Sequence, residues 1–131
     1  MTEYLSLGDV IAIHDYVMRR QGWATAPLRD EGALESAIMR PRTAAHYEDA
    51  DLTRQAVLLA VGISQAQAFL DGNKRAAYQA MDAFLLRNGR RYDGKPLELA
   101  EWFVCIAEQS SERDALVDSF EDWLRVRVVP I

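Results

Sequence analysis

Five consecutive residues, Asp71-Gly72-Asn73-Lys74-Arg75, combine a carboxylate, a flexible turn and two cations. Gly72 and Asn73 favour left-handed or bridging backbone conformations, so we expect a tight turn there. Lys74 and Arg75 then open a helix, where the positive end of the helix dipole disfavours cations. A bound anion would resolve that conflict, because free N–H groups at a helix N-terminus bind phosphate. The pattern predicts a phosphate or nucleotide cradle.

Asp71 adds a metal-binding group to this cradle. Mg²⁺ is commonly held by one or two carboxylates together with phosphate oxygens and water, so Asp71 can hold a Mg²⁺ that bridges the bound phosphates. The same five residues also fit a plain surface turn, followed by a helix whose basic side chains face water. The residue types alone leave both interpretations open.

The wider string from Ala68 to Ala77, AFLDGNKRAA, resembles the signature H-P-F-x-D-G-N-[GK]-R of the Fic/Doc family. Lys74 in the variable position matches the death-on-curing (Doc) version. Strings that resemble Doc-type proteins also occur in the same order around His14, over residues 28–37 and at Arg40-Pro41-Arg42. The resemblance runs from about residue 4 to about residue 90 and implies the Fic/Doc fold.

The resemblance also implies roles for the motif residues. Asp71 would hold Mg²⁺, and Asn73 and the Gly72 backbone would bind phosphate oxygens of ATP or another nucleoside triphosphate, which the two cations would neutralise. The implied catalytic positions are Gln67, Asp71, Lys74 and Arg75. The implied nucleotide-binding positions are Phe69, Gly72, Asn73, Lys74 and Arg75.

Gln67 is the main departure from the family pattern, because relatives carry the catalytic histidine there and a proline at the position of Ala68. A primary amide can position a hydroxyl by hydrogen bonding, but it cannot take a proton near neutral pH. Tyr78 is a second departure, since many Fic relatives have another arginine at that position. The fold and the cradle are therefore implied more firmly than the transfer reaction.

Two functions follow from the resemblance. The first is a Doc-like toxin of a toxin–antitoxin pair, which transfers a phosphoryl or nucleotidyl group to a hydroxyl of a protein in the translation machinery, weakly because of Gln67. A small antitoxin would inhibit it by folding its C-terminal segment into a groove beside the motif. The inhibitory string [ST]-x-x-x-E-[GN] of some relatives does not occur in this sequence, so inhibition would come from a partner. The alternative is an inactive module that binds nucleotide, phosphate or an antitoxin.

His14 lies on the apolar stripe of the first predicted helix, with Leu7, Val10, Ile11, Val17 and Met18. Its first interpretation is a histidine at the edge of the core that holds a helix by one hydrogen bond. Its second is a group near the cradle that replaces the missing catalytic histidine. The sequence leaves both open.

The bulk composition limits the function classes. The chain has 131 residues, of which 50% are hydrophobic and 27% charged, which predicts one globular domain over residues 1–131. It shows neither a long apolar run nor a secretory signal, so we expect a cytoplasmic protein without membrane contact. A net charge of −5 argues against direct nucleic-acid binding. The lone Cys105 is expected to be a small buried hydrophobic residue.

Hydrophobic periodicity predicts an all-α bundle of about six helices around a central helical hairpin. The first helix starts after Ser6 and stops at Gly22, and the second covers residues 31–40 until Pro41 ends it. A loop follows to about residue 51, with Arg40 and Arg42 as solvated charges. The later helices are expected at residues 52–68, 73–87, 96–109 and 111–127, with a turn or small hairpin at 90–96. Leu99, Ala100, Phe103, Val104 and Ala107 are expected to face inward.

Overall fold

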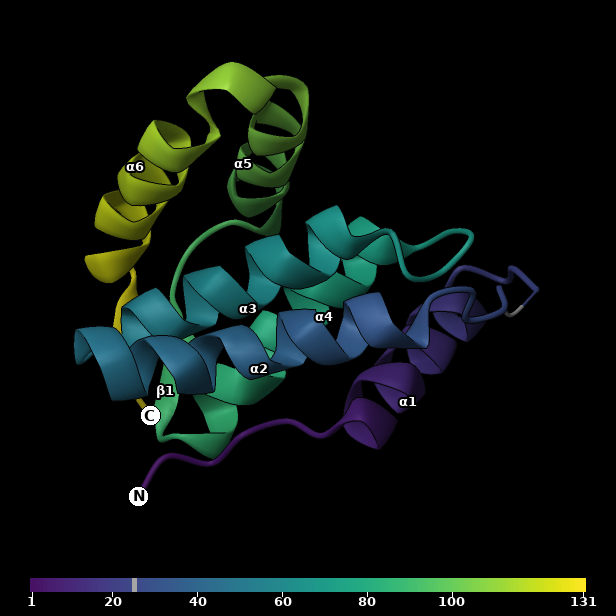
Figure 1. Ribbon diagram of the computed structural model, residues 1–131, viewed down its shortest axis with the longest axis horizontal. Coiled ribbons are helices and arrows are strands. Elements are labelled where there is room, and N and C mark those ends of the chain that lie inside the picture. The colour runs from purple at the N-terminus through teal and green to yellow at the C-terminus, as the bar shows by residue number, and fades with distance from the viewer. Residues whose placement is uncertain (25) are drawn as a thin grey trace.

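The computed structural model describes residues 1–24 and 26–131 and is almost entirely helical (Figure 1). The helices are α1 (Leu7–Arg20), α2 (Glu31–Glu48), α3 (Leu52–Ala66), α4 (Asn73–Arg87), α5 (Pro96–Glu108), the short 3-10 helix η1 (Ser110–Glu112) and α6 (Arg113–Arg125). The strands are β1 (Arg90–Tyr92) and β2 (Val128–Pro130). In the described part of the chain, every helix is too short or too polar to cross a bilayer.

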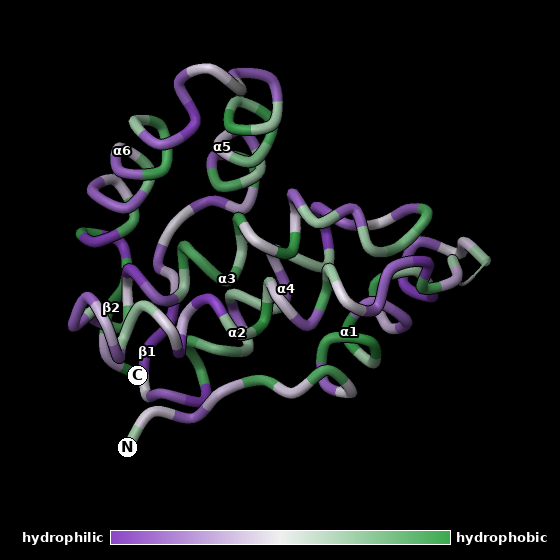
Figure 2. Tube along the Cα trace, viewed as in Figure 1, coloured by the Kyte–Doolittle hydropathy of each residue, from purple (hydrophilic) through white to green (hydrophobic). Residues whose placement is uncertain are grey.

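The α3–α4 hairpin forms the centre of the molecule, as the sequence predicts. Every residue of α3 from Gln55 to Ser64 is buried, because α2, α4 and the α5–α6 pair cover it on different sides. α4 turns its small residues Ala76, Ala77 and Ala80 toward this core. In Figure 2 the apolar, green stretches are prominent in α3 and α5. The all-α class and the central hairpin are confirmed.

α2 is longer than predicted, because it passes through Pro41 and ends only at Glu48. An internal proline costs about 3 kcal/mol in an isolated helix. Here Pro41 is buried and the helix packs closely against α3: a Cβ on Gly62 would lie 3.2 Å from the Ala37 Cβ. Asp49 then ends α2 in the left-handed conformation. Packing therefore overrides the local signal, so the predicted loop is wrong over residues 42–48 and present only at 49–51.

A two-stranded antiparallel sheet joins segments far apart in sequence. Arg91 of β1 pairs with Val129 of β2, and the Ile131 N–H donates to the Gly89 carbonyl at 3.2 Å. The Glu3 N–H also donates to the Asn88 side chain, so both chain ends lie near the end of α4 (Figure 1). α6 consequently stops at Arg125 instead of continuing to residue 127.

α5 and α6 pack on α3 as a second helical pair. Their contact is aromatic, with Trp102 stacked on Phe120 at 5.5 Å and Trp123 beside both. Ion pairs hold α6 to the start of α3: Arg54 contacts Glu121 at 2.8 Å, and Arg125 pairs with both Asp51 and Glu121. This docking fixes the position of α5 beside the first turns of α4.

α1 starts with the predicted capping box between Ser6 and Asp9. The Asp9 carboxylate also contacts the Arg87 guanidinium at 2.9 Å, which joins α1 to the end of α4. The hydrogen bond from Arg87, and then that from the Ser6 backbone, lowers the pKa of Asp9 to about 2.

We expect Asp9→Ala to lower the free energy of unfolding by about 1 kcal/mol near neutral pH. Since the folded pKa of Asp9 lies below its unfolded value of 3.8, its stabilisation is complete above that value and is lost as the pH falls toward 2. Urea denaturation of both proteins across the acid range measures this. A difference between wild type and variant that stays constant down to about pH 2 would contradict it.

Candidate phosphate-binding site and the adjoining groove

The loop between α3 and α4 is held on one side by the segment that precedes α2. Phe69 forms an isolated antiparallel bridge with Leu28, and the Arg29 N–H donates to the Ala68 carbonyl at 2.7 Å. The Leu70 N–H donates to the Pro27 carbonyl at 3.3 Å. Although Leu70 and Asp71 face solvent, the backbone beneath them is therefore tied to its neighbours.

Asn73 closes the loop from within. Its side-chain amide donates to the Phe69 carbonyl at 2.9 Å and accepts from the Phe69 N–H at 3.1 Å, and the residue is buried. Asn73 is the first residue of α4 and does not take the left-handed conformation expected for it. Both the oxygen and the nitrogen of its amide therefore hold the loop in its conformation.

Gly72 carries the sharp turn, with φ +79° in the left-handed region. A Cβ at this position would lie 2.8 Å from the Met18 sulfur and 3.2 Å from His14 Nε2, so a side chain does not fit unless these α1 side chains shift. No side chain of the described residues caps α4, so the N–H groups of its first turn have no partner within the helix. This end of α4 has the features expected of an anion-binding terminus.

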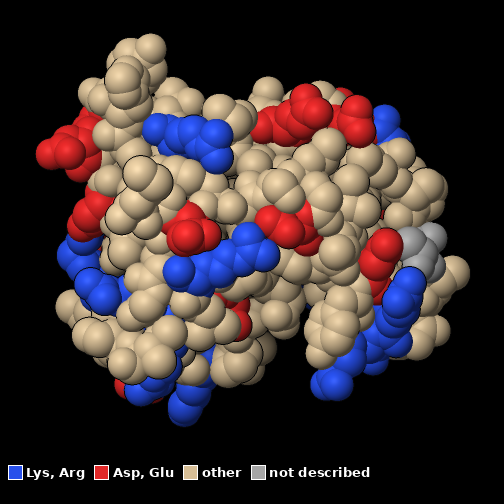
Figure 3. Space-filling model, turned by 90° about the horizontal axis from the view of Figure 1, so that it is seen from below, with Lys and Arg blue, Asp and Glu red and all other residues tan. Residues whose placement is uncertain are grey.

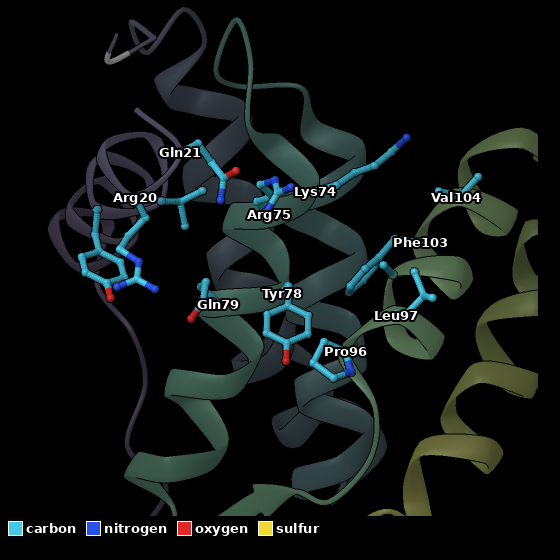
Figure 4. A pocket seen from close by; sticks show the side chains of 13 residues that line it. Arg20, Gln21, Lys74, Arg75, Tyr78, Gln79, Pro96, Leu97, Phe103 and Val104 are labelled. Carbon is cyan, nitrogen blue, oxygen red and sulfur yellow. The ribbon is translucent and has the colours of Figure 1, made fainter. Parts of the chain in front are cut away.

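Lys74 and Arg75 are exposed in that first turn. Among the described residues, neither is paired with a carboxylate, and the Arg75 guanidinium lies 5.7 Å over the Trp23 ring. Figure 4 shows Arg75 directed toward Gln21 of α1 and Lys74 directed toward α5. The sequence placed these two cations correctly at the start of the helix.

Asp71 is exposed, and its carboxylate accepts a hydrogen bond from the Gly72 N–H at 2.7 Å. The described residues contain no group of three His, Cys, Asp or Glu side chains that could hold a metal. One carboxylate fits a Mg²⁺ ion that takes its remaining ligands from phosphate and water, and does not fit a cage made by the protein alone.

Gln67 ends α3 in the left-handed conformation, with φ 51°. Its side-chain N–H donates to the Ser64 carbonyl at 3.0 Å, and its own carbonyl accepts from Arg29 Nε at 3.1 Å. The residue is exposed beside the loop. No local pattern predicts this backbone conformation, because glutamine rarely adopts it.

His14 is fully buried, and its Nε2 lies 2.7 Å from the Asp71 carbonyl oxygen. Its ring stacks on Phe69 with a centroid distance of 3.6 Å. A buried side chain that already binds the loop backbone cannot reach an incoming hydroxyl. The structure therefore favours the first interpretation of His14, a histidine that holds its neighbour by one hydrogen bond. That neighbour is the loop, not another helix.

A groove of about 620 Å³ adjoins the loop between α1, α4 and α5 (Figure 4). It is lined by Tyr16, Val17, Arg20, Gln21, Lys74, Arg75, Tyr78, Gln79, Pro96, Leu97, Ala100, Phe103 and Val104. Ala100 and Val104, which were expected to face inward, are exposed on the wall of this groove, as is Leu97. Cys105 is likewise half-buried instead of buried. The inward prediction for α5 was partly wrong, because the helix has apolar residues on two faces and only one packs on the core.

A second hollow continues from this groove along α1 and α4, and its lining includes Tyr16, Gln79 and Asp82. Burial raises the pKa of the Asp82 carboxyl. Burial, and then the nearby Asp82, raises the pKa of the Tyr78 hydroxyl. The groove thus has Lys74 and Arg75 beside the loop and Arg20 over the Tyr16 ring, whereas the Asp82 carboxyl lies in the second hollow.

Positive charge is local in this acidic chain. Figure 3 shows Lys and Arg side chains gathered beside a cleft at the lower right and in a second group at the lower left, with both signs of charge between them. With a net charge of −5, such a cluster favours a small or local anion over a long polyanion.

Two comparisons relate the chain to known proteins. A family model described as the Fic/DOC family matches residues 4–85, which include α1, α2, α3 and most of α4. The chain is also 34% identical to Toxin Doc of Mycolicibacterium smegmatis over 91 residues, which amount to 68% of this chain and 67% of that protein.

Proposed function

Because this chain belongs to the Fic/DOC family, we propose that it is a toxin-type protein whose loop from Asp71 to Arg75 binds a nucleoside triphosphate such as ATP with Mg²⁺. The bound nucleotide would donate a phosphoryl or nucleotidyl group to a hydroxyl of a protein in the translation machinery. The observation that carries the proposal is the start of α4, where a left-handed glycine precedes two cations and where the described residues supply neither a side-chain cap nor a carboxylate partner.

Each residue of the loop would have its own role in binding the nucleotide. The first-turn N–H groups of α4 would donate to phosphate oxygens, with Gly72 allowing the phosphate to approach the backbone closely. Lys74 and Arg75 would neutralise the charge that develops during transfer. Asp71 would hold Mg²⁺, which would supply positive charge to neutralise the phosphates. Buried Asn73 and Phe69 would keep the loop in this shape.

Gln67 lies where relatives carry the base, and it limits the proposed reaction. Its amide can orient a hydroxyl but cannot accept the proton that the hydroxyl must lose. Loss of a positioned base costs about two to four powers of ten in rate. We therefore propose slow transfer by the wild-type protein.

A second candidate function is a binding module without catalysis. The hydrogen bond from the Gln67 amide to the Ser64 carbonyl favours it, because the side chain is folded back on its own helix. Such a module would still bind nucleotide or phosphate through Lys74 and Arg75. It would also keep the groove for a partner.

The proposed partner is a small antitoxin whose C-terminal segment folds into the groove beside the loop. The apolar wall formed by Leu97, Val104 and Phe103 suits the apolar face of an amphipathic helix. Lys74 and Arg75, in the first turn of α4, suit carboxylates at the end of such a helix that lies near the loop. Binding there would obstruct the approach of a protein substrate in the cytoplasm.

Calorimetric titration with ATP and Mg²⁺ tests the nucleotide-binding proposal. We expect the wild type to bind and Arg75→Ala to bind at least about tenfold more weakly, since a charge-assisted contact to phosphate is lost. Arg42→Ala is the matched control, because Arg42 is exposed on α2, over the Tyr4 ring, and does not line the groove. Undetectable binding by both wild type and Arg75→Ala would return Asp71 to Arg75 to a plain surface turn.

A further inference from the structure

His14 is the buried contact between α1 and the phosphate-binding loop. Its side chain is fully buried, its Nε2 lies 2.7 Å from the Asp71 carbonyl oxygen, and its ring is stacked within 5° of parallel on Phe69. It therefore touches the loop at two points, on either side of the exposed Leu70. Met18 of α1 also lies beside the loop, next to Gly72.

The geometry determines which ring nitrogen carries the proton. A carbonyl oxygen can only accept, so Nε2 must donate to Asp71. Nδ1 is buried without a hydrogen-bond partner among the described residues, and the nearest carboxylate, that of Asp15, lies 4.0 Å away. A proton on Nδ1 would be left unsatisfied in the core, which favours the ring form with the proton on Nε2 alone.

We propose that His14 is a positioning residue for the phosphate-binding loop, an inference that rests on the proposed function. By holding the Asp71 carbonyl inward, the ring directs the Asp71 carboxylate and the N–H groups that follow Gly72 outward, toward the ligand. The close packing leaves little freedom for the loop, because Nε2 would lie 3.2 Å from a Cβ on Gly72. His14 thus acts through Asp71 and does not touch the nucleotide.

Two substitutions separate the hydrogen bond from the ring contact. His14→Phe keeps an aromatic ring against Phe69 and removes the donor. His14→Gln keeps an N–H at about the reach of Nε2 and removes the ring. If the N–H donor of His14 determines the loop conformation, His14→Phe should weaken the affinity for ATP with Mg²⁺ by about tenfold. His14→Gln, which keeps a donor, should have an affinity within about threefold of wild type. His46→Phe, at the other histidine of the chain and exposed on α2, is the control.

Two NMR measurements on the ligand-free proteins supply readouts that do not depend on nucleotide binding. Long-range ¹H–¹⁵N spectra should place the His14 proton on Nε2. Amide exchange at Gly72 should be faster in His14→Phe than in wild type, and restored in His14→Gln, because the loop backbone opens when the Asp71 carbonyl is released.

Failure of the positioning role of His14 can be distinguished from failure of the proposed nucleotide binding. Absence of nucleotide binding by the wild type overturns the proposed function, while the exchange comparison still supports or overturns the positioning role. An Nε2 without a proton would overturn the proposal, as would unchanged exchange and affinity in His14→Phe. It would also be overturned if folded His14→Gln matched His14→Phe in affinity and exchange, because the ring contact would then be what positions the loop.

Discussion

Replacing Gln67 with histidine is expected to raise transfer of label from ATP to protein by about two to four powers of ten. Position 67 lies at the end of α3 beside the loop and is exposed to solvent. Histidine supplies a group that can take the proton of an incoming hydroxyl, which glutamine cannot do. Histidine also tolerates the left-handed backbone at this position better than most residues.

The measurement uses ATP labelled at the γ- or the α-phosphate in parallel reactions with a lysate of the source organism. The γ-label reports phosphoryl transfer and the α-label reports nucleotidyl transfer. Gln67→Asn is the matched control, because it accepts the same backbone and also cannot titrate. Gln67→His with Asp71→Ala should return to background if Asp71 holds the metal. Wild-type transfer equal to that of Gln67→His would show that the proton acceptor is not at position 67.

Tyr78 provides the test if Gln67→His alone has no effect. Its side chain points into the groove toward Pro96, one turn of α4 beyond Arg75, at the position where many relatives have a second arginine (Figure 4). Transfer that appears only when Tyr78→Arg accompanies Gln67→His would locate the second deficiency in charge neutralisation.

Gly72→Ala is expected to cost about 2–4 kcal/mol of unfolding free energy and to abolish ATP binding. The left-handed backbone of Gly72 is unfavourable for any residue with a Cβ. The added methyl group would also lie 2.8 Å from the Met18 sulfur and press on His14, which holds the loop. Strain and steric overlap therefore add at a single site.

Gly89→Ala is the matched control for that substitution. Gly89 has a similar left-handed conformation, with φ +75°, and a Cβ there would have nothing within 4 Å. Its cost should be the backbone strain alone, about 1–2 kcal/mol. Urea denaturation and calorimetry compare the two variants. Equal losses of stability with unchanged ATP binding in Gly72→Ala would show that contact with α1 does not set the shape of the loop.

Turn residues, capping residues and hydrophobic periodicity predicted the elements whose formation depends mainly on neighbouring residues in the sequence. The glycine before Lys74 and Arg75 predicted a turn at the start of a helix, and the apolar runs on either side predicted a buried hairpin. Both are present, as α3, Gly72 and α4. The capping box at Ser6 and the stripe that includes His14 were predicted for the same reason.

The errors lie where distant contacts override local signals. Pro41 indicated a helix end, but packing of α2 on α3 carries the helix past it. β1 and β2 have three residues each and pair across most of the C-terminal third, so neither is apparent in its own sequence. The apolar residues of α5 indicated burial without distinguishing the core from the groove.

In the candidate site, too, the local features were predicted and the contacts between distant residues were not. The sequence located the loop and its cations but could not show that the Asn73 amide is engaged by Phe69. It also left two interpretations of His14, which the contact with Asp71 decided. The resemblance implied a groove beside the motif, but residue patterns could not identify its lining, because its walls come from three helices.

Calorimetry of wild type and Gln67→His with ATP and Mg²⁺, carried out beside the transfer assay on the same preparations, separates binding from proton transfer. We predict dissociation constants within about threefold of each other, together with transfer rates that differ at least a hundredfold, because position 67 serves the reaction and not the ground-state complex. Affinities that differ as much as the rates, or no binding by either protein, would contradict a nucleotide cradle that has kept its binding residues and lost its base.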